Sequence, residues 1–434
     1  MSKNVTLEDI VSLCKRRGFI FQGSEVYGGL SGTWDYGPLG VVLKKNITDL
    51  WWKLFVADRD DMYGVDTAIL MNQKVLQASG HVDTFTDPLV ECSICKGRFR
   101  EDKIDTSKCP TCGTKSPFGL ARQFNMMFKT SVGPVDDEAA VSYLRPETAQ
   151  GIFTNFKNVV DTFYPDLPFG IAQVGKAFRN EISPRDFVFR AREFEQMEVE
   201  YFVHPDNWEQ MFEGWVMGIH KWLELLGLPK DKIHELEVPE SDRAHYSKRT
   251  IDFEFDFPHG RDELLGLAYR TDFDLGNIQR VSGKSMEYTV KVTNEKFIQH
   301  VIEPSFGVDR TVMAVITSAY TEDEVNGEKR VYLKLPAHLA PVKVAVSPLL
   351  KNKPELVAKA KEVYDMLKKE FGAVMWDDNG NIGKRYRRQD EIGTPNCVVI
   401  DFDTLEDETV TIRDRDSTTQ TRIKIDNLIS EINE

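Results

Sequence analysis

The chain has 434 residues, enough for two or three domains with separate cores. Hydrophobic residues make up 41% and charged residues 29%, and the absence of any run of about 18 apolar residues argues against a transmembrane helix. The formal net charge of −14 argues against a nonspecific nucleic-acid coat, because phosphate binding depends on Lys and Arg, but it leaves room for a local basic patch such as GKRYRRQDE at 383–391.

The first residues and the cysteine content indicate in which cellular compartment the protein is located. The opening MSKNVTLEDIVSLCKRRGF lacks the apolar core and the small-residue cleavage site of a secretory signal. The chain has six cysteines, four of them clustered, which is typical of a metal site in a reducing compartment rather than of a disulfide framework. We therefore expect a cytoplasmic protein that does not associate with a membrane.

Two strong amphipathic helices are predicted. Residues 39–55 and 206–226 both place apolar side chains at helical intervals. Asp206 is a candidate N-cap of the second helix, and Gly227 is a candidate stop. Both apolar stripes contain tryptophan, and at this spacing packing in the core is favoured over stacking on a ligand.

Four cysteines lie in the segment CSICKGRFREDKIDTSKCPTC. Cys92, Cys95, Cys109 and Cys112 form two CxxC pairs separated by thirteen residues. Each pair can present two thiolates to one tetrahedral ion, although four free thiols or two disulfides would also fit the spacing. We expect a structural Zn²⁺ in a segment too small to fold without metal.

The remaining elements predict two different folds. Strands follow one another without intervening helical crossovers at 170–178, 190–203, 250–257, 285–292 and 297–303. This order favours a largely antiparallel sheet. Beyond Pro341, strands alternate with helices, which indicates a separate α/β domain of about a hundred residues. We place the boundary near residue 337 and assign the whole chain to the α+β class.

The segment FRNEISPRDFVFRAREFEQMEVEYF at 178–202 is the richest in charged side chains, and SPRD predicts a turn between two strands. Period two puts the following side chains on one face of the second strand: Arg190, Arg192, Phe194, Gln196, Glu198 and Glu200. Arginines, an aromatic ring and carboxylates together suit a nucleoside triphosphate. A solvated sheet face explains the same pattern equally well.

Glu303 raises a separate question. It lies in the mostly apolar run KFIQHVIEPSFGVDRTVMAVI. A buried carboxylate costs several kcal/mol unless a positive group meets it. The sequence therefore predicts a cation, from the chain or from a substrate, beside Glu303.

These motifs resemble a known family. FRNE followed by Arg190-x-x-x-Phe194-x-x-x-Glu198 is similar to the second signature motif of class II aminoacyl-tRNA synthetases. GGLSGTWDYGPLG, ASGHVDTFTDP, RQFNMMFKT, LRPETAQGIF, AYRTDFDL and VIEPSFGVDR resemble, in order, the glycyl-tRNA synthetases of the homodimeric type. RRQDEIGTP and VTIRDRD resemble their anticodon-binding domain, so the likeness covers nearly the whole chain.

The resemblance implies an architecture. The catalytic domain, residues 1–336, would hold an antiparallel sheet flanked by helices, with a zinc-ribbon insertion at 91–117 and a helical insertion at 205–250. Residues 337–434 would form the α/β anticodon-binding domain. A homodimer would form through the region after the helix 39–55.

The resemblance also implies a reaction, in which glycine and MgATP form a glycyl adenylate and the glycyl group passes to tRNA. Arg179 would hold the α-phosphate, Arg310 the γ-phosphate, and Glu181 would lie near the adenine amino group. The full implied ATP set is Arg179, Asn180, Glu181, Phe189, Arg190, Ala191, Arg192, Glu193, Phe194, Glu263, Leu264, Gly307, Val308, Asp309 and Arg310.

Glycine itself supplies the cation for Glu303 in this interpretation. Glu147, Glu198 and Glu303 would face its ammonium group, Ser305 would narrow the pocket around the α-carbon, and Arg100 would face the amino acid. The full implied glycine set is Arg100, Glu147, Phe194, Glu195, Gln196, Met197, Glu198, Glu303, Pro304, Ser305, Phe306 and Gly307.

The chain departs from the class pattern in three places. The first motif of the class ends on a proline that VDTAILMN does not supply, the cysteine insertion is compact, and the third motif has Glu303 and Ser305 where small residues are usual. Two other hypotheses stay open: a class II synthetase for another amino acid, and a non-catalytic relative that binds RNA. The second is disfavoured because such relatives typically lose motif arginines or pocket carboxylates, which this chain retains.

Overall fold

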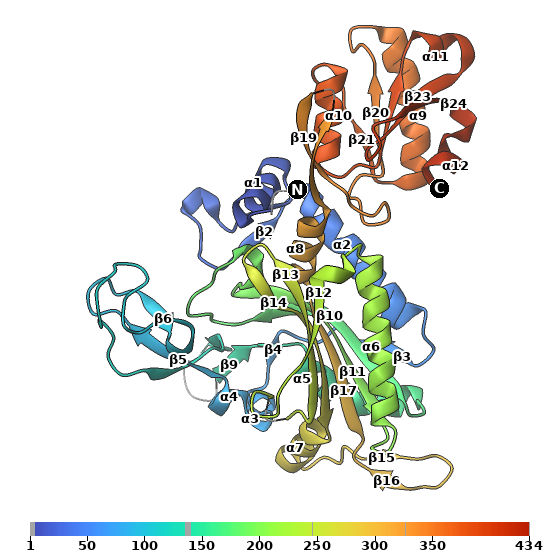
Figure 1. The fold of residues 1–434 in the computed structure, drawn as a ribbon. Coiled ribbons are helices and arrows are strands. Elements are labelled where there is room, and N and C mark those ends of the chain that lie inside the picture. The colour runs from blue at the N-terminus through green and yellow to red at the C-terminus, as the bar shows by residue number, and fades with distance from the viewer. Residues whose placement is uncertain (1–4, 135–139, 245, 326, 434) are drawn as a thin grey trace.

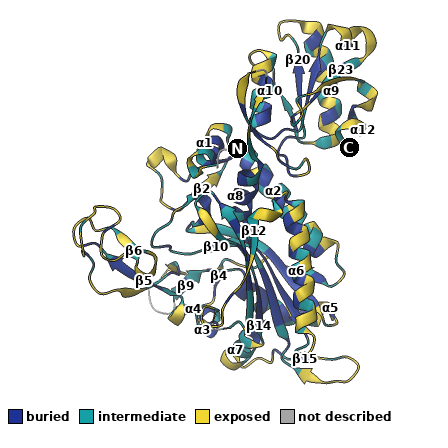
Figure 2. Ribbon diagram, viewed as in Figure 1, coloured by how far each residue is buried: buried dark blue, intermediate teal, exposed yellow. Residues whose placement is uncertain are grey.

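The computed structural model describes residues 5–134, 140–244, 246–325 and 327–433. A large part of the chain surrounds a seven-stranded sheet, and the C-terminal residues form a smaller part around a five-stranded sheet (Figure 1). Strands of both sheets are mainly buried, whereas the insertion around β5 and β6 is largely exposed (Figure 2). The expected α+β class with an antiparallel catalytic sheet is confirmed.

The main sheet has the order β12-β13-β14-β17-β11-β10-β3, and only the β10–β3 pair is parallel. Its strands are β3 (Met62–Gly64), β10 (Phe169–Phe178), β11 (Glu193–Val203), β12 (Ile233–Glu237), β13 (Arg249–Phe257), β14 (Gly260–Thr271) and β17 (His300–Gly307). The sequence did not predict β12 or β14. The strand expected at 285–292 was wrong, since only the two-residue β15 (Tyr288–Thr289) forms there and pairs with β16 (Lys296–Phe297).

Three helices pack on one face of this sheet. They are α2 (Pro38–Trp52), which continues as a π-helical turn at Lys53–Ala57, α6 (Trp208–Leu225) and α8 (Val308–Ala319). Trp51 and Trp222 are fully buried in this core, so the tryptophan stripes are packing surfaces as expected. Gly227 follows α6 with φ +74°, but Asn207 precedes the helix, so the expected cap at Asp206 is wrong.

The opposite face of the sheet is only partly covered. Helices α5 (Ala149–Phe163) and α7 (Phe273–Ser282) bury one end of it against Phe169, Phe202 and Val301. Because side chains alternate along β11, Phe194, Gln196, Glu198 and Glu200 share this face with Phe202. The uncovered part is where the candidate site lies.

Smaller elements surround the sheet. The N-terminal residues form α1 (Leu7–Arg17), β1 (Ile20–Gln22) and β2 (Trp34–Tyr36). The segment between β3 and α5 contains β4 (Leu70–Met71), α3 (Gln73–Ala78), α4 (His81–Thr84), β5 (Thr86–Glu91), β6 (Arg98–Arg100), β7 (Arg122–Asn125), β8 (Lys129–Ser131) and β9 (Val141–Leu144). The insertion expected at 205–250 is only partly helical, since α6 and the 3₁₀ turn Lys230–Lys232 are followed by β12, the edge strand of the main sheet.

The C-terminal sheet has the order β21-β20-β22-β23-β24 and its own buried core. Its elements are β20 (Val344–Pro348), α9 (Pro354–Phe371), β21 (Val374–Trp376), α10 (Ile382–Glu391), β22 (Asn396–Ile400), α11 (Phe402–Asp407), β23 (Thr409–Asp414), β24 (Gln420–Lys424) and α12 (Leu428–Asn433). The hairpin of β18 (Tyr320–Val325) and β19 (Glu328–Leu333) connects α8 to this part and packs on α10.

The basic sequence at 383–391 does not form a free cationic patch. Arg385 is buried and donates to the carbonyl oxygens of Pro348 and Gly380. Arg388 pairs with Asp377, and Arg387 contacts the Glu328 carboxylate at 3.4 Å. These arginines on α10 therefore bind mainly to the protein itself.

A buried ionic network joins the hairpin to α10. Asp390 is fully buried and accepts two hydrogen bonds from Arg413 at 2.8 and 3.0 Å and one from Arg330 at 3.2 Å. Arg330, also buried, pairs in addition with Asp323 in β18. Such a network positions two elements, and losing one partner leaves the others charged inside the protein.

We expect Asp390→Asn to destabilise the protein by about 3 kcal/mol, because two buried guanidinium groups lose their shared carboxylate. Urea unfolding, followed by tryptophan fluorescence and by circular dichroism, measures the change. Asp365→Asn is the matched control, since Asp365 forms an exposed pair with Lys361 and should change stability by less than about 0.5 kcal/mol. Equal effects of the two substitutions would contradict this account of the network.

Candidate active site

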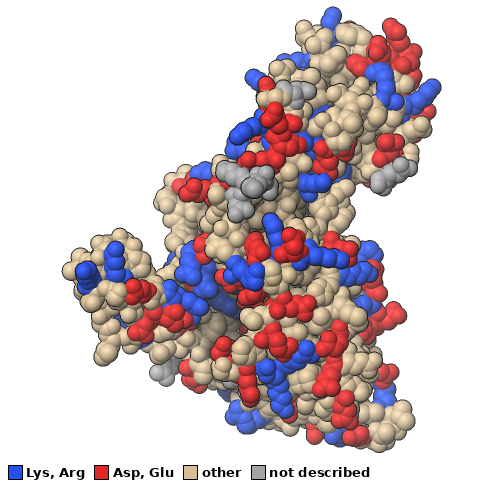
Figure 3. Space-filling view, in the orientation of Figure 1, with Lys and Arg blue, Asp and Glu red and all other residues tan. Residues whose placement is uncertain are grey.

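A cavity of about 440 Å³ opens on the uncovered face of the main sheet. Its walls come from β11, β13, β14 and β17 and from the 3₁₀ turn Phe187–Phe189. Figure 3 shows the molecule hollowed beside the β5–β6 insertion, with Lys and Arg side chains around the hollow. The four strands are consecutive in the sheet, which places their side chains in one rigid array.

Most of the predicted site residues line this cavity. They are Arg100, Glu147, Arg179, Glu181, Phe189, Arg190, Ala191, Phe194, Glu195, Gln196, Glu198, Glu263, Leu264, Glu303, Ser305, Gly307, Asp309 and Arg310. The cavity lining does not include Asn180, Arg192, Glu193, Met197, Pro304, Phe306 and Val308. Met197, Phe306 and Val308 are buried in the core on the other face of the sheet.

Arg192 differs most from its expected place. The regular strand β11 begins at Glu193, so the period-two pattern does not extend back to Arg192. Its guanidinium donates to the carbonyl oxygen of Glu181 at 3.0 and 3.2 Å and to that of Ser31 at 2.8 Å. It therefore ties the turn after β10 to the N-terminal segment.

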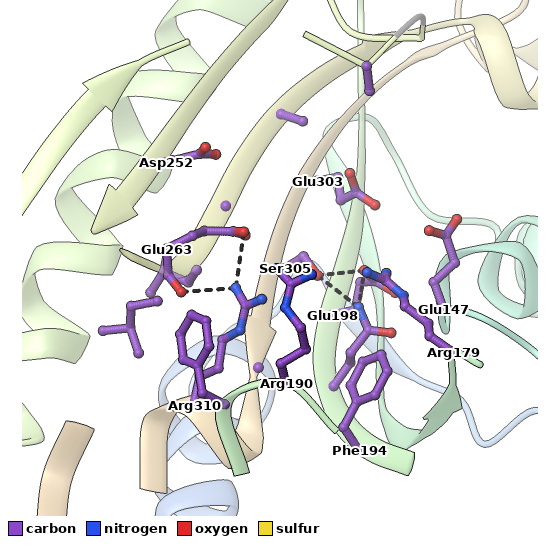
Figure 4. A pocket seen from close by; sticks show the side chains of 18 of the residues that line it. Glu147, Arg179, Arg190, Phe194, Glu198, Asp252, Glu263, Glu303, Ser305 and Arg310 are labelled. Atoms are coloured by element: carbon purple, nitrogen blue, oxygen red, sulfur yellow. Dashed lines mark hydrogen bonds and ion pairs between the residues drawn. The ribbon is translucent and has the colours of Figure 1, made fainter. Parts of the chain in front are cut away.

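The cavity carries arginines beside aromatic rings at two places. Arg179 lies over the Phe194 ring at 5.3 Å and donates to the carbonyl oxygen of Pro146 at 3.1 Å. Arg310 lies over the Phe189 ring at 4.4 Å and contacts the Glu263 carboxylate at 3.0 Å (Figure 4). This combination of cations and flat rings suits a nucleoside triphosphate.

The two acidic groups near Arg310, Glu263 and Asp252, have pKa values that are shifted in opposite directions. Burial opposes ionisation of Glu263, but Arg310 outweighs it and lowers the pKa of Glu263. Burial together with Glu263 and Glu254 raises the pKa of Asp252 to about 7. Glu263 is therefore the carboxylate that stays ionised at this end.

The other end of the cavity carries three carboxyl groups. Figure 4 shows Glu147, Glu198 and Glu303 grouped there, away from Arg310. Glu198 accepts hydrogen bonds from Ser305 Oγ at 2.7 Å, from Gln196 Nε2 at 3.3 Å and from Thr148. Its cross-strand partner in β17 is Ser305, so the sheet register itself brings these two side chains together.

Glu303 already has one cation within the protein. Arg270 Nη1 donates to Glu303 Oε1 at 2.7 Å, and the same guanidinium holds both oxygens of Asp274 at 2.8 and 2.9 Å. Burial nevertheless raises the pKa of Glu303 to about 8, against the opposing effect of Arg270. The single guanidinium of Arg270 is shared with Asp274 and therefore does not fully offset the cost of burying an ionised Glu303.

The neighbours of Glu303 add to the negative charge. Burial and the nearby Glu147 raise the pKa of Glu198. Burial also opposes ionisation of Glu147, but His81, with Nε2 3.5 Å from its carboxylate, outweighs burial and lowers the pKa of Glu147. The negative charge at this end of the cavity is therefore not fully compensated by the protein, and a further cation would be bound favourably there.

Sequence reasoning missed several groups around this cavity. Arg270 and Asp274 belong to AYRTDFDL, four residues apart, and Tyr246 and Asp252 line the wall. An arginine at the end of the apolar stretch LLGLAYR was the available signal, because a buried arginine implies carboxylate partners. For Tyr246 no sequence pattern distinguished the residue.

Arg100 connects the cysteine insertion to the cavity. It lies at the end of β6, lines the cavity, and contacts Asp87 at 3.0 Å and Asp102 at 2.8 Å. Asp87 in β5 belongs to the same small sheet as Arg100. The position of the insertion therefore determines where this guanidinium points.

The four clustered cysteines have the geometry of a metal site. The Sγ atoms of Cys92 and Cys112 are 3.7 Å apart, and those of Cys95 and Cys109 are 3.6 Å apart. Tetrahedral Zn–S bonds of about 2.3 Å require sulfur atoms about 3.8 Å apart. All six cysteines of the chain are free. The alternative of two disulfides is therefore wrong, and the donor set fits a tetrahedral ion.

Comparisons with known proteins agree with this geometry. Residues 118–320 match the family model "tRNA synthetase class II core domain (G, H, P, S and T)", and residues 343–434 match "Anticodon binding domain". The glycine–tRNA ligase of Borrelia garinii subsp. bavariensis is 50% identical over 433 residues, 99% of this chain and 97% of that protein. The glycine–tRNA ligase of Thermobifida fusca is 48% identical over 449 residues, covering 98% and 97%.

The chain belongs to the glycine–tRNA ligase family. The resemblance to glycyl-tRNA synthetases is thereby confirmed, and a class II enzyme for another amino acid is disfavoured. This member retains Arg179, Arg310, Glu147, Glu198 and Glu303 in one cavity, which argues against a non-catalytic relative. Among the described residues, no helix is both long and apolar enough to span a membrane.

Proposed function

We propose that the protein ligates glycine to its tRNA in two steps at this cavity, through a glycyl-adenylate intermediate. The observation that carries the proposal is the polarity of the cavity, with Arg310 at one end, surplus carboxylates at the other and Arg179 beside those carboxylates. A substrate that joins an ammonium group to a carboxylate fits between them. Family membership supports the same reaction.

The triphosphate of ATP would extend from Arg179 to Arg310. Arg179 would hold the α-phosphate and Arg310 the γ-phosphate, since guanidinium groups bind phosphate oxygens through paired hydrogen bonds. Phe194 would stack on adenine, Glu181 would lie near its amino group, and Glu263 with Leu264 would line the nucleotide. Mg²⁺ bound to the triphosphate would neutralise part of its charge.

Glycine would lie at the carboxylate end. Glu147, Glu198 and Glu303 would face its ammonium group, and Ser305, held by its bond to Glu198, would crowd the α-carbon. A substrate without a side chain can be selected only by its two charged ends and by exclusion of a methyl group. Arg100 would face the amino acid from the insertion.

The first step needs alignment more than a reactive side chain. The glycine carboxylate attacks the α-phosphorus, pyrophosphate leaves, and negative charge on the α-phosphate oxygens increases in the transition state. A guanidinium already in place at Arg179 stabilises that charge without reorganisation. No nucleophile of the protein is required.

We also propose the rest of the expected organisation. Residues 1–336 would be the catalytic domain and 337–434 the anticodon-binding domain, which the separate core of the C-terminal sheet supports. A homodimer would form through the region after α2, where Leu70 is 51% exposed. Six free cysteines support a reducing, cytoplasmic location.

The decisive experiment is ATP–pyrophosphate exchange with each of the twenty amino acids supplied separately. Glycine alone should support exchange, because every longer side chain meets Ser305 and the carboxylates. Exchange with a different amino acid would contradict the assignment of glycine. Absence of exchange with all twenty would contradict catalysis.

We propose that Cys92, Cys95, Cys109 and Cys112 hold about one structural Zn²⁺ per chain. Cys92→Ser combined with Cys95→Ser should release the ion and make the segment 91–117 sensitive to protease, because this exposed segment has little apolar core of its own. Elemental analysis and limited proteolysis measure both effects. Cys14→Ala and Cys397→Ala are the controls and should retain the metal. Full zinc retention in the double variant would disprove the site.

Glu303→Gln should weaken glycine binding selectively, because it keeps the shape of the side chain and removes its charge. Loss of a charge-assisted hydrogen bond costs about 1.5–3 kcal/mol, or roughly ten- to a hundredfold in the KM for glycine. Binding of ATP without glycine should barely change. Pyrophosphate exchange and equilibrium ATP binding measure the two quantities.

Because Glu303 also pairs with Arg270, the same variant tests whether Glu303 has a purely structural role. If Glu303 only braces the sheet, Glu303→Gln should lower thermal stability and ATP binding together, without a selective effect on glycine. Ser305→Ala removes a neutral hydroxyl and should have a smaller effect on the KM for glycine. An unchanged glycine dependence in Glu303→Gln would refute a role for Glu303 at the ammonium group.

A further inference from the structure

Glu200 is a buried carboxyl group that the proposed reaction does not use. Its residue is 0% exposed, and neither carboxyl oxygen has a hydrogen-bond partner among the residues that the structure describes. It follows Glu198 by two positions in β11, so both side chains lie on the same face of the sheet. Glu200 does not line the cavity itself and lies behind its wall.

Glu200 is close to two of the proposed glycine ligands. Carboxyl oxygens of Glu198, Glu200 and Glu303 all lie within 4.8 Å of one another. The charged groups that face Glu200 are Glu198 on its own strand, Glu303 on β17, Arg270 on β14 and Asp274 on α7. Four carboxyl groups thus meet one guanidinium, and Asp274 already binds that guanidinium through both oxygens.

The hydrogen bonds indicate which carboxyl group carries a proton. Glu198 accepts from Ser305 at 2.7 Å and from Gln196 at 3.3 Å, and Glu303 accepts from Arg270 at 2.7 Å. Each of these two groups therefore has donors that stabilise its ionised form. Glu200 has none, and like charges in a shared buried site cannot all ionise.

The titration behaviour agrees with this assignment. Burial, followed by the charge of Glu303, raises the pKa of Glu200 well above its ordinary value. Burial raises the pKa of Glu303 to about 8 in spite of Arg270. At pH 7 the cluster therefore retains at least one proton, and a small rotation of Glu200 would place its hydroxyl on a neighbouring carboxylate.

We propose that Glu200 holds this proton in the free protein and that the ammonium group of glycine displaces it to solvent on binding. The proposal rests on the glycine site proposed above. The O–H bond of the Glu200 carboxyl breaks, its proton passes to water, and the ammonium keeps its three protons. Glu200 is a positioning residue, because it sets the charge of the cluster and does not touch glycine.

The proposal requires that the affinity for glycine change with pH in a defined direction. Below the pKa of the cluster, glycine must displace a proton, so its affinity rises as the pH increases. Release of one proton corresponds to a change of up to about tenfold in the KM for glycine per pH unit. We expect the KM for glycine to fall as the pH rises from 6.5 towards 8, because the raised pKa of Glu200 keeps its carboxyl group protonated at the lower pH.

Calorimetry on the unaltered full-length protein tests the proton directly. Glycine is titrated at pH 7 in two buffers of different ionisation enthalpy, and the difference in heat gives the number of protons released per site. We expect close to one. Glycine binding with no net release would overturn the proposal while leaving the glycine site in place, whereas absence of both binding and pyrophosphate exchange would overturn the proposed function as well.

Glu200→Gln tests the assignment to this residue. The amide imitates the protonated carboxyl and has no proton to lose, so proton release should fall to near zero, the KM for glycine at pH 8 should exceed that of the unaltered protein, and its dependence on pH should be largely lost. A residue with a merely structural role would leave the slope of the pH profile unchanged. Glu235→Gln is the matched control, because Glu235 lies exposed in β12 beside His220, and it should keep both the release and the slope. Release that persists in Glu200→Gln would overturn the assignment.

Discussion

The surplus of buried negative charge on one face of the main sheet is the constraint on which the site depends. Glu198, Glu200 and Glu303 approach one another within 4.8 Å, and Arg270 is the guanidinium that meets them. Ionised groups in such a place are costly without an additional cation. The protein therefore folds around a charge imbalance that the ammonium group of the proposed substrate would relieve.

The sheet makes this imbalance possible because it fixes each carboxyl group by register. Glu198 in β11 lies opposite Ser305 in β17, and Glu303 lies opposite Ala268 in β14. On the other face, Met197 and Phe306 bury their side chains in the main core. Moving any of these strands by one residue would exchange charged and apolar side chains between the faces. The apolar core thus holds in place a polar array that would not assemble alone.

The parts of the structure that sequence reasoning predicted are those with strong local patterns. The cysteine pairs, the tryptophan-bearing helices and the alternation from Phe194 to Glu200 each follow from spacing alone, and the fold class followed from the order of strands and helices along the chain. The predictions that failed needed long-range information. Arg385 lies in a charged run, yet α10 turns it inward to the carbonyl oxygen of Pro348. The strand β14 is an exception, since Pro258 and Gly260 mark the turn that separates it from β13 and were available as a local signal. Arg192 fitted the alternation, but the regular strand begins one residue later.

In the proposed reaction the cavity would also order its two substrates with respect to each other. The carboxylates at Glu303 would repel an ATP phosphate chain, whereas Arg179 and Arg310 would attract it, so its direction would be fixed. Glycine would have the opposite preference, since the carboxylates would attract its ammonium group and repel its own carboxylate, which Arg179 would attract. The same imbalance that selects the amine would then point the nucleophilic oxygen of glycine at the α-phosphorus. Electrostatic polarity along one cavity would thus supply both the specificity and the alignment on which adenylate formation depends.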